Sequence, residues 1–156
     1  TALMQLRAKG KGGINILRAR GQMSWSRSRW KLQTRIDANF SLDAQREKGY
    51  GMSIAQDVHY TFAKVPLVLQ LRVQGFDART WDNRIYLYEN DVLYANSTPA
   101  TYGIGGRVYV NMRWQIIKPL GLYVRLSETI YARTWEMEKG RRSRGDIHVV
   151  MRWTIN

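Results

Sequence analysis

The sequence has no cysteine, few acidic residues and no long apolar run. The absence of cysteine excludes a disulfide scaffold, a thiolate metal site and a thiol nucleophile. No stretch approaches the roughly 18 apolar residues of a transmembrane helix, although a transmembrane β-strand needs only about 9–11 residues. The 12 Asp and Glu residues face 25 Lys and Arg residues, which gives a formal net charge of +13.

Apolar residues are plentiful: 44% of the chain is hydrophobic and 12% is aromatic, which argues against a disordered basic tail. The length fits one domain or a piece of a larger one. The chain starts at Thr1 in a stretch that already alternates, without an initiator methionine. We therefore expect either that a signal peptide has been removed or that this is the C-terminal part of a longer protein, and we favour the second.

Strict alternation of apolar and polar residues is the dominant pattern, and it is typical of half-buried β-strands. From Trp30 to Phe40, every second residue is apolar or small and the residues between are polar. No useful helical periodicity occurs. The sequence predicts eight antiparallel strands, at residues 2–7, 17–25, 29–40, 50–60, 67–74, 107–116, 122–127 and 147–155.

The predicted connections alternate between tight turns and longer loops. The tight ones are at residues 26–28, 64–66 and 118–121, and the long ones at 41–49, 78–106 and 134–146. A glycine-rich hairpin at residues 9–12 is short but occupies the same end of the strands as the long loops. Outer-membrane barrels are built with short turns on one side and longer loops on the other, and an even strand number places both termini on the short-turn side.

Aromatic residues at the ends of the apolar strand faces also favour a lipid environment, since transmembrane barrels carry aromatic girdles at both interfaces. The predicted girdle consists of Trp25, Trp30, Phe40, Tyr50, Tyr60, Trp114 and Trp153. Gln56 and Glu128 oppose this interpretation because they fall on the same faces. A β-bulge near Glu128 would turn its side chain inward, or it would lie near the interface.

Basic residues recur on the polar faces of the strands. They are Arg18, Arg20, Arg29, Lys31, Arg35, Arg72, Arg107, Arg113, Arg125 and Arg152. In a barrel lumen these cations would favour the passage of anions, or the binding of an acidic plug or partner. The commonest arrangement in a narrow barrel is different: ladders of arginine, aspartate and glutamine satisfy one another's charges and hydrogen bonds. In a soluble sheet the faces are inverted, and the same cations would form a nucleic-acid-binding surface.

Two loops carry further features. Within 78–106, Ile85–Glu89 and Val92–Tyr94 are predicted to form a hairpin around Asn90 and Asp91 that either extends the wall or folds inward as a plug. Within 134–146, a basic cluster is a candidate contact for lipopolysaccharide phosphates, although a solvated loop explains it equally well. The cluster is Lys139, Arg141, Arg142 and Arg144.

The only catalytic candidate is a serine, histidine and aspartate set on one strand, comprising Ser53, Asp57 and His59. Without a nucleophile elbow or an oxyanion loop, a lumen-facing polar ladder is the commoner explanation. The glycines at 103–106 lack the Lys-Ser/Thr of a phosphate loop, and the histidines and acids lack metal-site spacing. We predict no enzyme activity, cofactor or metal, with a lipid-modifying barrel enzyme as the last alternative.

The stretches 84–94, 99–107 and 111–114 together resemble a Gram-negative outer-membrane family that carries a β-barrel after a helix-hairpin-helix domain. The resemblance covers roughly Phe76 to Asn156. It implies an outer-membrane location and a longer parent barrel. The helix-hairpin-helix segment itself is not recognised in this sequence, so the resemblance implies no DNA-related role, and it supplies no catalytic residues.

Together these patterns predict one domain over residues 1–156, with 78–106 as a long extracellular loop or hairpin. The domain would be an antiparallel transmembrane β-barrel in the outer membrane, either eight strands or the C-terminal eight of a larger barrel. It would act as a scaffold, a porin-like pore or an assembly component. The expected partners are the lipid bilayer, lipopolysaccharide, and other barrel strands or outer-membrane subunits, whereas soluble nucleic-acid binding is the main alternative.

Overall fold

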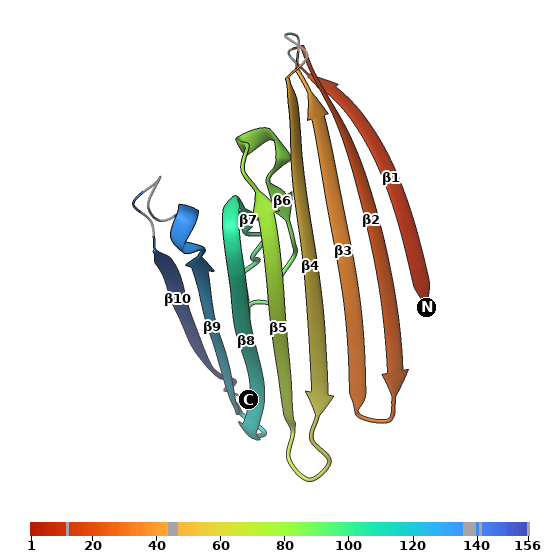
Figure 1. Ribbon diagram of the computed structural model, residues 1–156. Coiled ribbons are helices and arrows are strands. Elements are labelled where there is room, and N and C mark those ends of the chain that lie inside the picture. Colours follow the sequence, from red (N-terminus) through yellow and green to blue (C-terminus); the bar gives the residue numbers. More distant parts are fainter. Residues whose placement is uncertain (12, 44–46, 136–139, 141, 156) are drawn as a thin grey trace.

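One large antiparallel sheet dominates the computed structural model, which describes residues 1–11, 13–43, 47–135, 140 and 142–155 (Figure 1). The sheet contains eight strands in the order β1-β2-β3-β4-β5-β8-β9-β10. Their bounds are β1(Ala2–Lys11), β2(Ile14–Arg27), β3(Trp30–Leu42), β4(Lys48–Thr61), β5(Leu67–Ala78), β8(Gly103–Ile117), β9(Leu120–Tyr131) and β10(Ser143–Trp153). The all-β, antiparallel prediction is confirmed.

Each long strand pairs with its neighbour along the chain, because the alternating pattern and the tight turns fix one register. Trp30 pairs with Tyr60 and Phe40 pairs with Tyr50, so the aromatic ends of β3 and β4 lie side by side. The turn between β2 and β3 places Ser28 at a positive φ of 53°. With 10 to 15 residues, the strands are longer than the usual five or six.

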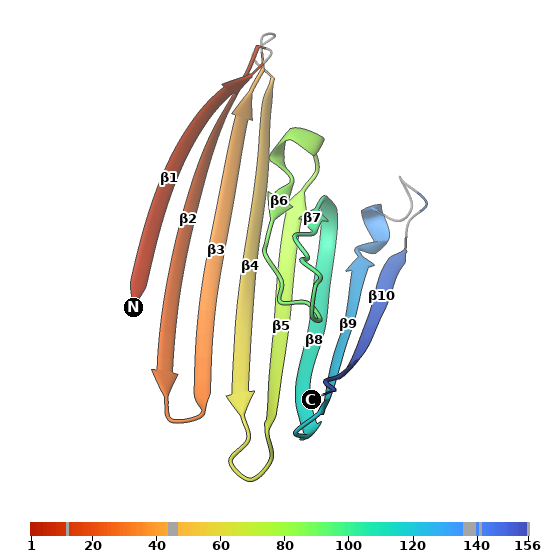
Figure 2. The same ribbon diagram turned by 180° about the vertical axis from the view of Figure 1, so that it is seen from behind.

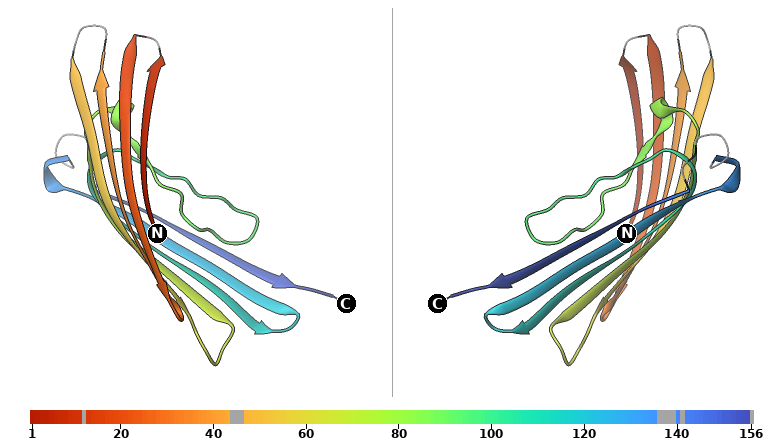
Figure 3. Two further views of the ribbon diagram at one scale, coloured as in Figure 1. Left: turned by 90° about the vertical axis from the view of Figure 1, so that its right-hand side faces the viewer. Right: turned by 90° about the vertical axis from the view of Figure 1, so that its left-hand side faces the viewer.

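The sheet curves into an open trough and does not close on itself (Figure 3). Strands β1 and β10 are its two edges, and they are not hydrogen-bonded to each other. A closed barrel of these eight strands, one of the two architectures predicted, is therefore not what the described residues form. Both termini lie in the half of the sheet that carries the tight turns (Figure 1).

The two faces of the trough have opposite polarity. On the convex outer face, apolar side chains are exposed, as in Met52, Ile54 and Val73, with 53–56% of each residue accessible. On the concave inner face, polar and charged side chains are buried. A water-soluble antiparallel sheet has the reverse arrangement, with its apolar face covered.

Residues 79–102 lie across the inner face (Figure 2). This inner segment contains η1(Trp81–Asn83), β6(Ile85–Tyr86) and β7(Ala100–Thr101), and β6 pairs with β7. Glu89 forms an isolated bridge with Ser97. The predicted pairing of Ile85–Glu89 with Val92–Tyr94 is wrong, because the turn is wider. The predicted 78–106 loop is also too long, since Ala78 belongs to β5 and 103–106 belong to β8.

The two polar residues predicted on the apolar face remain there. The Thr34 hydroxyl donates a 2.6 Å hydrogen bond to the Gln56 Oε1 atom, so these neighbours satisfy each other. Glu128 pairs with Val108 in continuous register and is exposed. The bulge expected near Glu128 is not present in this strand pair, where the irregularity lies between Gln115 and Ile117, beside the tight turn.

Candidate functional site

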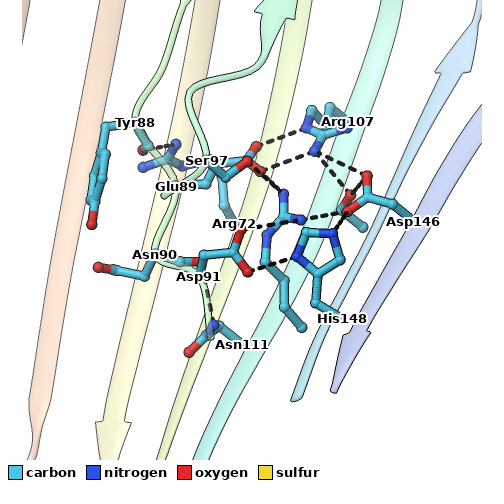
Figure 4. Close-up of polar contacts among 12 residues, drawn as sticks. Arg72, Tyr88, Glu89, Asn90, Asp91, Ser97, Arg107, Asn111, Asp146 and His148 are labelled. Carbon is cyan, nitrogen blue, oxygen red and sulfur yellow. Dashed lines mark hydrogen bonds and ion pairs between the residues drawn. The ribbon is translucent and has the colours of Figure 1, made fainter. Parts of the chain in front are cut away.

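The inner face has two parts, which differ in how their charges are compensated. The covered half comprises the inner-face side chains of β4, β5, β8, β9 and β10, against which the inner segment packs (Figure 4). The open half comprises the inner-face side chains of β1 and β2. Strand β3 lies between the two halves and contributes to both.

Glu89 is the centre of the covered half. This inner-segment residue is fully buried, and its carboxylate accepts bonds from Arg107 Nε at 2.7 Å and Arg107 Nη2 at 3.0 Å. Arg125 Nη2 donates to the same carboxylate. The Arg107 guanidinium also donates to the hydroxyls of Ser127 and Thr129 on β9. One buried carboxylate thus joins two strands to the inner segment.

A second contact lies beside it, where Asp91 meets β10. The buried Asp91 carboxylate lies 2.9 Å from the Nδ1 atom of His148 and accepts a 2.7 Å bond from the Val92 backbone NH. Asp146 on β10 accepts a 2.7 Å bond from the Ser127 hydroxyl and forms an ion pair with Arg125. Figure 4 shows Glu89 and Asp91 directed from the inner segment towards this group.

Arg72 anchors the middle of the inner segment. Its Nε and Nη2 atoms donate to the two oxygens of Asp57 at 2.6 and 2.8 Å, in the bidentate geometry that favours arginine. Its Nη1 atom donates to the Tyr88 carbonyl at 2.8 Å. Removing one partner of such a buried pair costs far more than the pair contributes, because the other charge remains buried.

The inner segment is also fixed where it leaves β5. Asn83 is fully buried, and its amide donates to the Ser41 hydroxyl at 2.7 Å. The Asn39 amide donates to the Asn83 carbonyl at 3.1 Å. Gly51 of β4 permits this approach, since a Cβ atom there would lie 2.2 Å from the Asn83 carbonyl oxygen.

Apart from Arg29, the predicted basic ladder lies on the inner face but is not uniform. Arg29 was predicted on a strand face but lies exposed in the turn between β2 and β3. Arg35, Arg72, Arg107 and Arg125 are buried and pair with carboxylates, while the partly exposed Arg20 pairs with Asp37. Among the described residues, no carboxylate lies within ion-pair distance of the remaining five. These are Arg18, Arg29, Lys31, Arg113 and Arg152.

Sequence reasoning missed Glu89 and Asp91 as the compensating acids. It expected ladders of arginine, aspartate and glutamine on the strands to satisfy one another, and it gave the segment between the strands no part in compensating the charge. A compositional signal was present, because four of the 12 acidic residues fall within residues 77–91. In a basic chain, such a local concentration of acid indicates a segment that complements the cations elsewhere.

The catalytic candidates do not form a hydrogen-bonded relay within the described part of the chain. Asp57 is bound by Arg72 and by a 3.5 Å bond from Gln33, and the buried Ser53 hydroxyl has no hydrogen-bond partner. His59 is half-buried, and no hydrogen bond links its ring to either residue. The geometry matches the polar ladder that was the commoner expectation.

Of the loop cluster, Lys139 and Arg141 lie outside the described residues, whereas Arg142 and Arg144 are exposed. Arg144 lines a cavity of about 580 Å³ together with Arg107, Arg125 and His148. Of the two described loop cations, Arg144 is therefore continuous with the covered half.

The predicted girdle residues lie on the outer face, in register with its apolar side chains. Trp30 and Tyr60 have ring centroids 4.4 Å apart near the tight turns, and Phe40 pairs with Tyr50 near the other end. Three more tryptophans lie near the tight-turn ends of other strands, and 37–60% of each residue is exposed. They are Trp25 on β2, Trp114 on β8 and Trp153 on β10. The outer face thus carries aromatic rings at both ends of β3 and β4.

Within the described ranges, no helix has both the length and the apolar character to span a membrane. Comparisons with protein-family models, with curated proteins and with solved structures find no match for this chain. The functional argument therefore depends on the geometry of the two faces.

Proposed function

We propose that this chain forms part of the wall of a transmembrane β-barrel in a Gram-negative outer membrane. In this proposal the outer face contacts lipid, and the inner segment lies in the lumen as a plug. The protein acts as a scaffold or as a constricted pore. The observation that carries the proposal is the inverted polarity of the sheet, with apolar residues exposed and charged residues buried.

The exposed apolar surface is too extensive for an ordinary soluble monomer, in which contiguous patches rarely exceed a few hundred Å². It extends across all eight strands, and near the β10 edge Ile147, Val149 and Met151 are 59–70% exposed. The interval from Trp30 to Phe40 spans roughly 33 Å at about 3.3 Å per residue. At a tilt of about 40° this corresponds to roughly 25 Å, the height of the apolar band of outer-membrane barrels.

The inner segment supports a barrel of more than eight strands. A closed eight-stranded barrel has only enough room for its own side chains. Here the concave side also holds residues 79–102, including the buried Leu87, Glu89 and Asp91. Closure therefore needs additional strands at the edges β1 and β10, either from a longer chain or from other subunits. The resemblance of residues 76–156 to the C-terminal barrel of a larger outer-membrane protein agrees with this proposal.

Soluble nucleic-acid binding has less support. Such a surface needs cations that reach phosphates in solvent. Arg35, Arg72, Arg107 and Arg125 are instead buried and paired with carboxylates. Arg142 and Arg144 are exposed at the end of the sheet opposite the tight turns. In the proposed orientation these two loop cations are available to lipopolysaccharide phosphates.

The decisive experiment compares lysine at two adjacent valines of β10 that face opposite ways. Val149 is on the outer face, four residues from the girdle residue Trp153, while Val150 is on the inner face. After transfer from urea into detergent micelles, we expect a heat-dependent gel band at the size of a multimer for the wild type, because the eight strands of one chain do not close alone. Val149→Lys should lower the free energy of unfolding by about 2–4 kcal/mol, the cost of a lysine near mid-bilayer. Val150→Lys should have a smaller effect.

The opposite order of the two variants would contradict the proposal, because an outer face in contact with water rather than lipid would tolerate lysine at Val149. A folded monomer in buffer without detergent would also overturn it. A heat-sensitive band at the size of a multimer would support additional strands from other subunits. Circular dichroism of β-type in micelles confirms that each variant is folded before the comparison.

A further inference from the structure

The open half contains a cation arrangement that no carboxylate of the described residues compensates. Arg7 on β1 and Arg18 on β2 are directly opposite each other in the antiparallel register. Directly opposed like charges destabilise a sheet. Among the described residues, no carboxylate lies within ion-pair distance of either arginine. The Arg18 Nε atom is buried without a hydrogen-bond partner, although an unpaired buried donor is costly.

A cavity lies where these arginines meet the inner segment. It has a volume of about 150 Å³, far above the roughly 10–15 Å³ that one water needs. Four arginines line it, namely Arg7, Arg18, Arg20 and Arg84, and Asp37 is the only carboxylate among the described residues of its lining. Asp37 is already bound by Arg35 and Arg20, so it does not neutralise the other cations. A second cavity of about 410 Å³ shares Arg18 and Arg84 and adds Lys9 and Asp82. Among the described residues, Asp82 forms no ion pair with any of these three cations.

Arg84 is held in position as a ligand-binding arginine would be. Its Nε atom donates a 2.5 Å bond to the Tyr86 hydroxyl, and its Nη1 atom donates a 2.7 Å bond to the Trp81 carbonyl. The guanidinium also lies 4.4 Å from the centroid of the Trp81 ring. No hydrogen bond uses the Nη2 atom within the described structure. A prepositioned guanidinium loses less conformational entropy when it binds an oxyanion.

We propose that this cavity, at the junction of β1, β2 and the inner segment, binds the phosphate group of a soluble phosphorylated solute. Arg7, Arg18 and Arg84 would donate to the phosphate oxygens, since guanidinium groups match tetrahedral oxyanions through charge-assisted bonds. The bound anion would separate the opposed charges of Arg7 and Arg18 and satisfy the buried Nε atom. The site concerns the inner face alone, so it does not depend on what covers the outer face.

The test is calorimetric titration of the folded protein with inorganic phosphate at constant ionic strength, with chloride as the reference anion. We expect saturable binding at one site in the wild type. Arg18→Gln and Arg84→Gln should each weaken the affinity tenfold or more. The matched control is Arg152→Gln, which removes the same charge from the inner face of β10. Arg152 also has a buried Nε atom without a partner, but it lines neither cavity.

An affinity unchanged in the Arg152 variant and reduced in the other two would support the site. Equal losses in all three variants would overturn it, because binding would then follow net charge alone. Absence of saturable phosphate binding to the folded wild type would also overturn it. Two variants on different elements keep the test valid if one fails to fold, and circular dichroism checks folding before each titration.

A second arm identifies the source of the phosphate. Purified lipopolysaccharide is added to the protein that has bound inorganic phosphate. Displacement would assign the site to a lipid phosphate and overturn the soluble solute, whereas no displacement supports it. The solvent in which the protein folds tests the proposed membrane role separately. If the protein folds in plain buffer and still binds phosphate as described, the barrel proposal fails and the anion site stands.

Discussion

The two halves of the inner face carry similar side chains but reach different electrostatic states. In the covered half, Arg107 and Arg125 share the buried carboxylate of Glu89, and Arg72 has its own partner in Asp57. In the open half, Arg7 and Arg18 lie opposite each other without a carboxylate within ion-pair distance in the described chain. The difference shows that the inner segment supplies part of the negative charge that compensates the arginines of the sheet. Within the described chain, its acidic side chains pair with arginines of the covered half, but not with those of β1 and β2.

The largest expected effect comes from removing the charge that the covered half needs most. Glu89→Gln would leave Arg107 and Arg125 in a buried site without their shared anion. Breaking a buried ion pair in this way costs about 3–5 kcal/mol. We expect a loss of this size in the free energy of unfolding, measured by urea titration of the folded protein.

The matched control is Asp82→Asn, which removes one negative charge from the same inner segment. Asp82 is partly exposed and takes part in no ion pair within the described residues, so its loss should change stability little. Similar losses for both variants would mean that the overall charge of the segment matters, rather than the buried contact of Glu89. The comparison between the two halves would then lose its physical basis.

The strands and their faces were predictable because they depend on a short-range property. Apolar residues at every second position, as from Trp30 to Phe40, specify a strand and its two faces without knowledge of its partners. Tight turns such as Lys118–Pro119 then pair each strand with its neighbour. The basic ladder on the inner face followed from the same alternation.

The inner segment was not predictable in the same way, because its position depends on contacts distant in sequence. Residues 79–102 have no sustained periodicity, and the bridge of Glu89 to Ser97 replaced the tighter hairpin predicted around Asn90 and Asp91. Glu89 is 18 residues from Arg107 and 36 from Arg125. Whether the sheet closes depends on curvature accumulated over all strands, which no local pattern reveals.

A smaller effect is expected where the inner segment is seated on the sheet. In Gly51→Ala, the new Cβ atom would lie 2.2 Å from the Asn83 carbonyl oxygen and 3.1 Å from the Asn83 Cβ atom. Overpacking of this kind typically costs about 1–3 kcal/mol. Besides a lower urea midpoint, we expect faster proteolysis of the inner segment, because its first anchor is displaced.

The control for this prediction is Gly21→Ala, a substitution of the same size in β2. No atom lies within 4 Å of a Cβ atom built at Gly21. Alanine there should be neutral or slightly stabilising, since glycine within a strand costs about 0.5–1 kcal/mol relative to alanine. If Gly51→Ala is equally harmless, the close packing of Asn83 against Gly51 does not hold the inner segment in place.

The smallest effect should have the opposite sign and should come from the open half. Arg7→Gln removes one of two directly opposed cations and, in the absence of phosphate, should raise the free energy of unfolding by about 0.2–1 kcal/mol. The gain should shrink as sodium chloride increases, because the screening length falls from about 10 Å at 0.1 M to about 3 Å at 1 M, which is shorter than the separation of directly opposed side chains. Saturating phosphate at constant ionic strength should reverse the order of the two proteins, since only the wild type retains the full set of donors. A stability gain that is the same with and without phosphate would show that the opposed arginines repel each other but do not form a binding site.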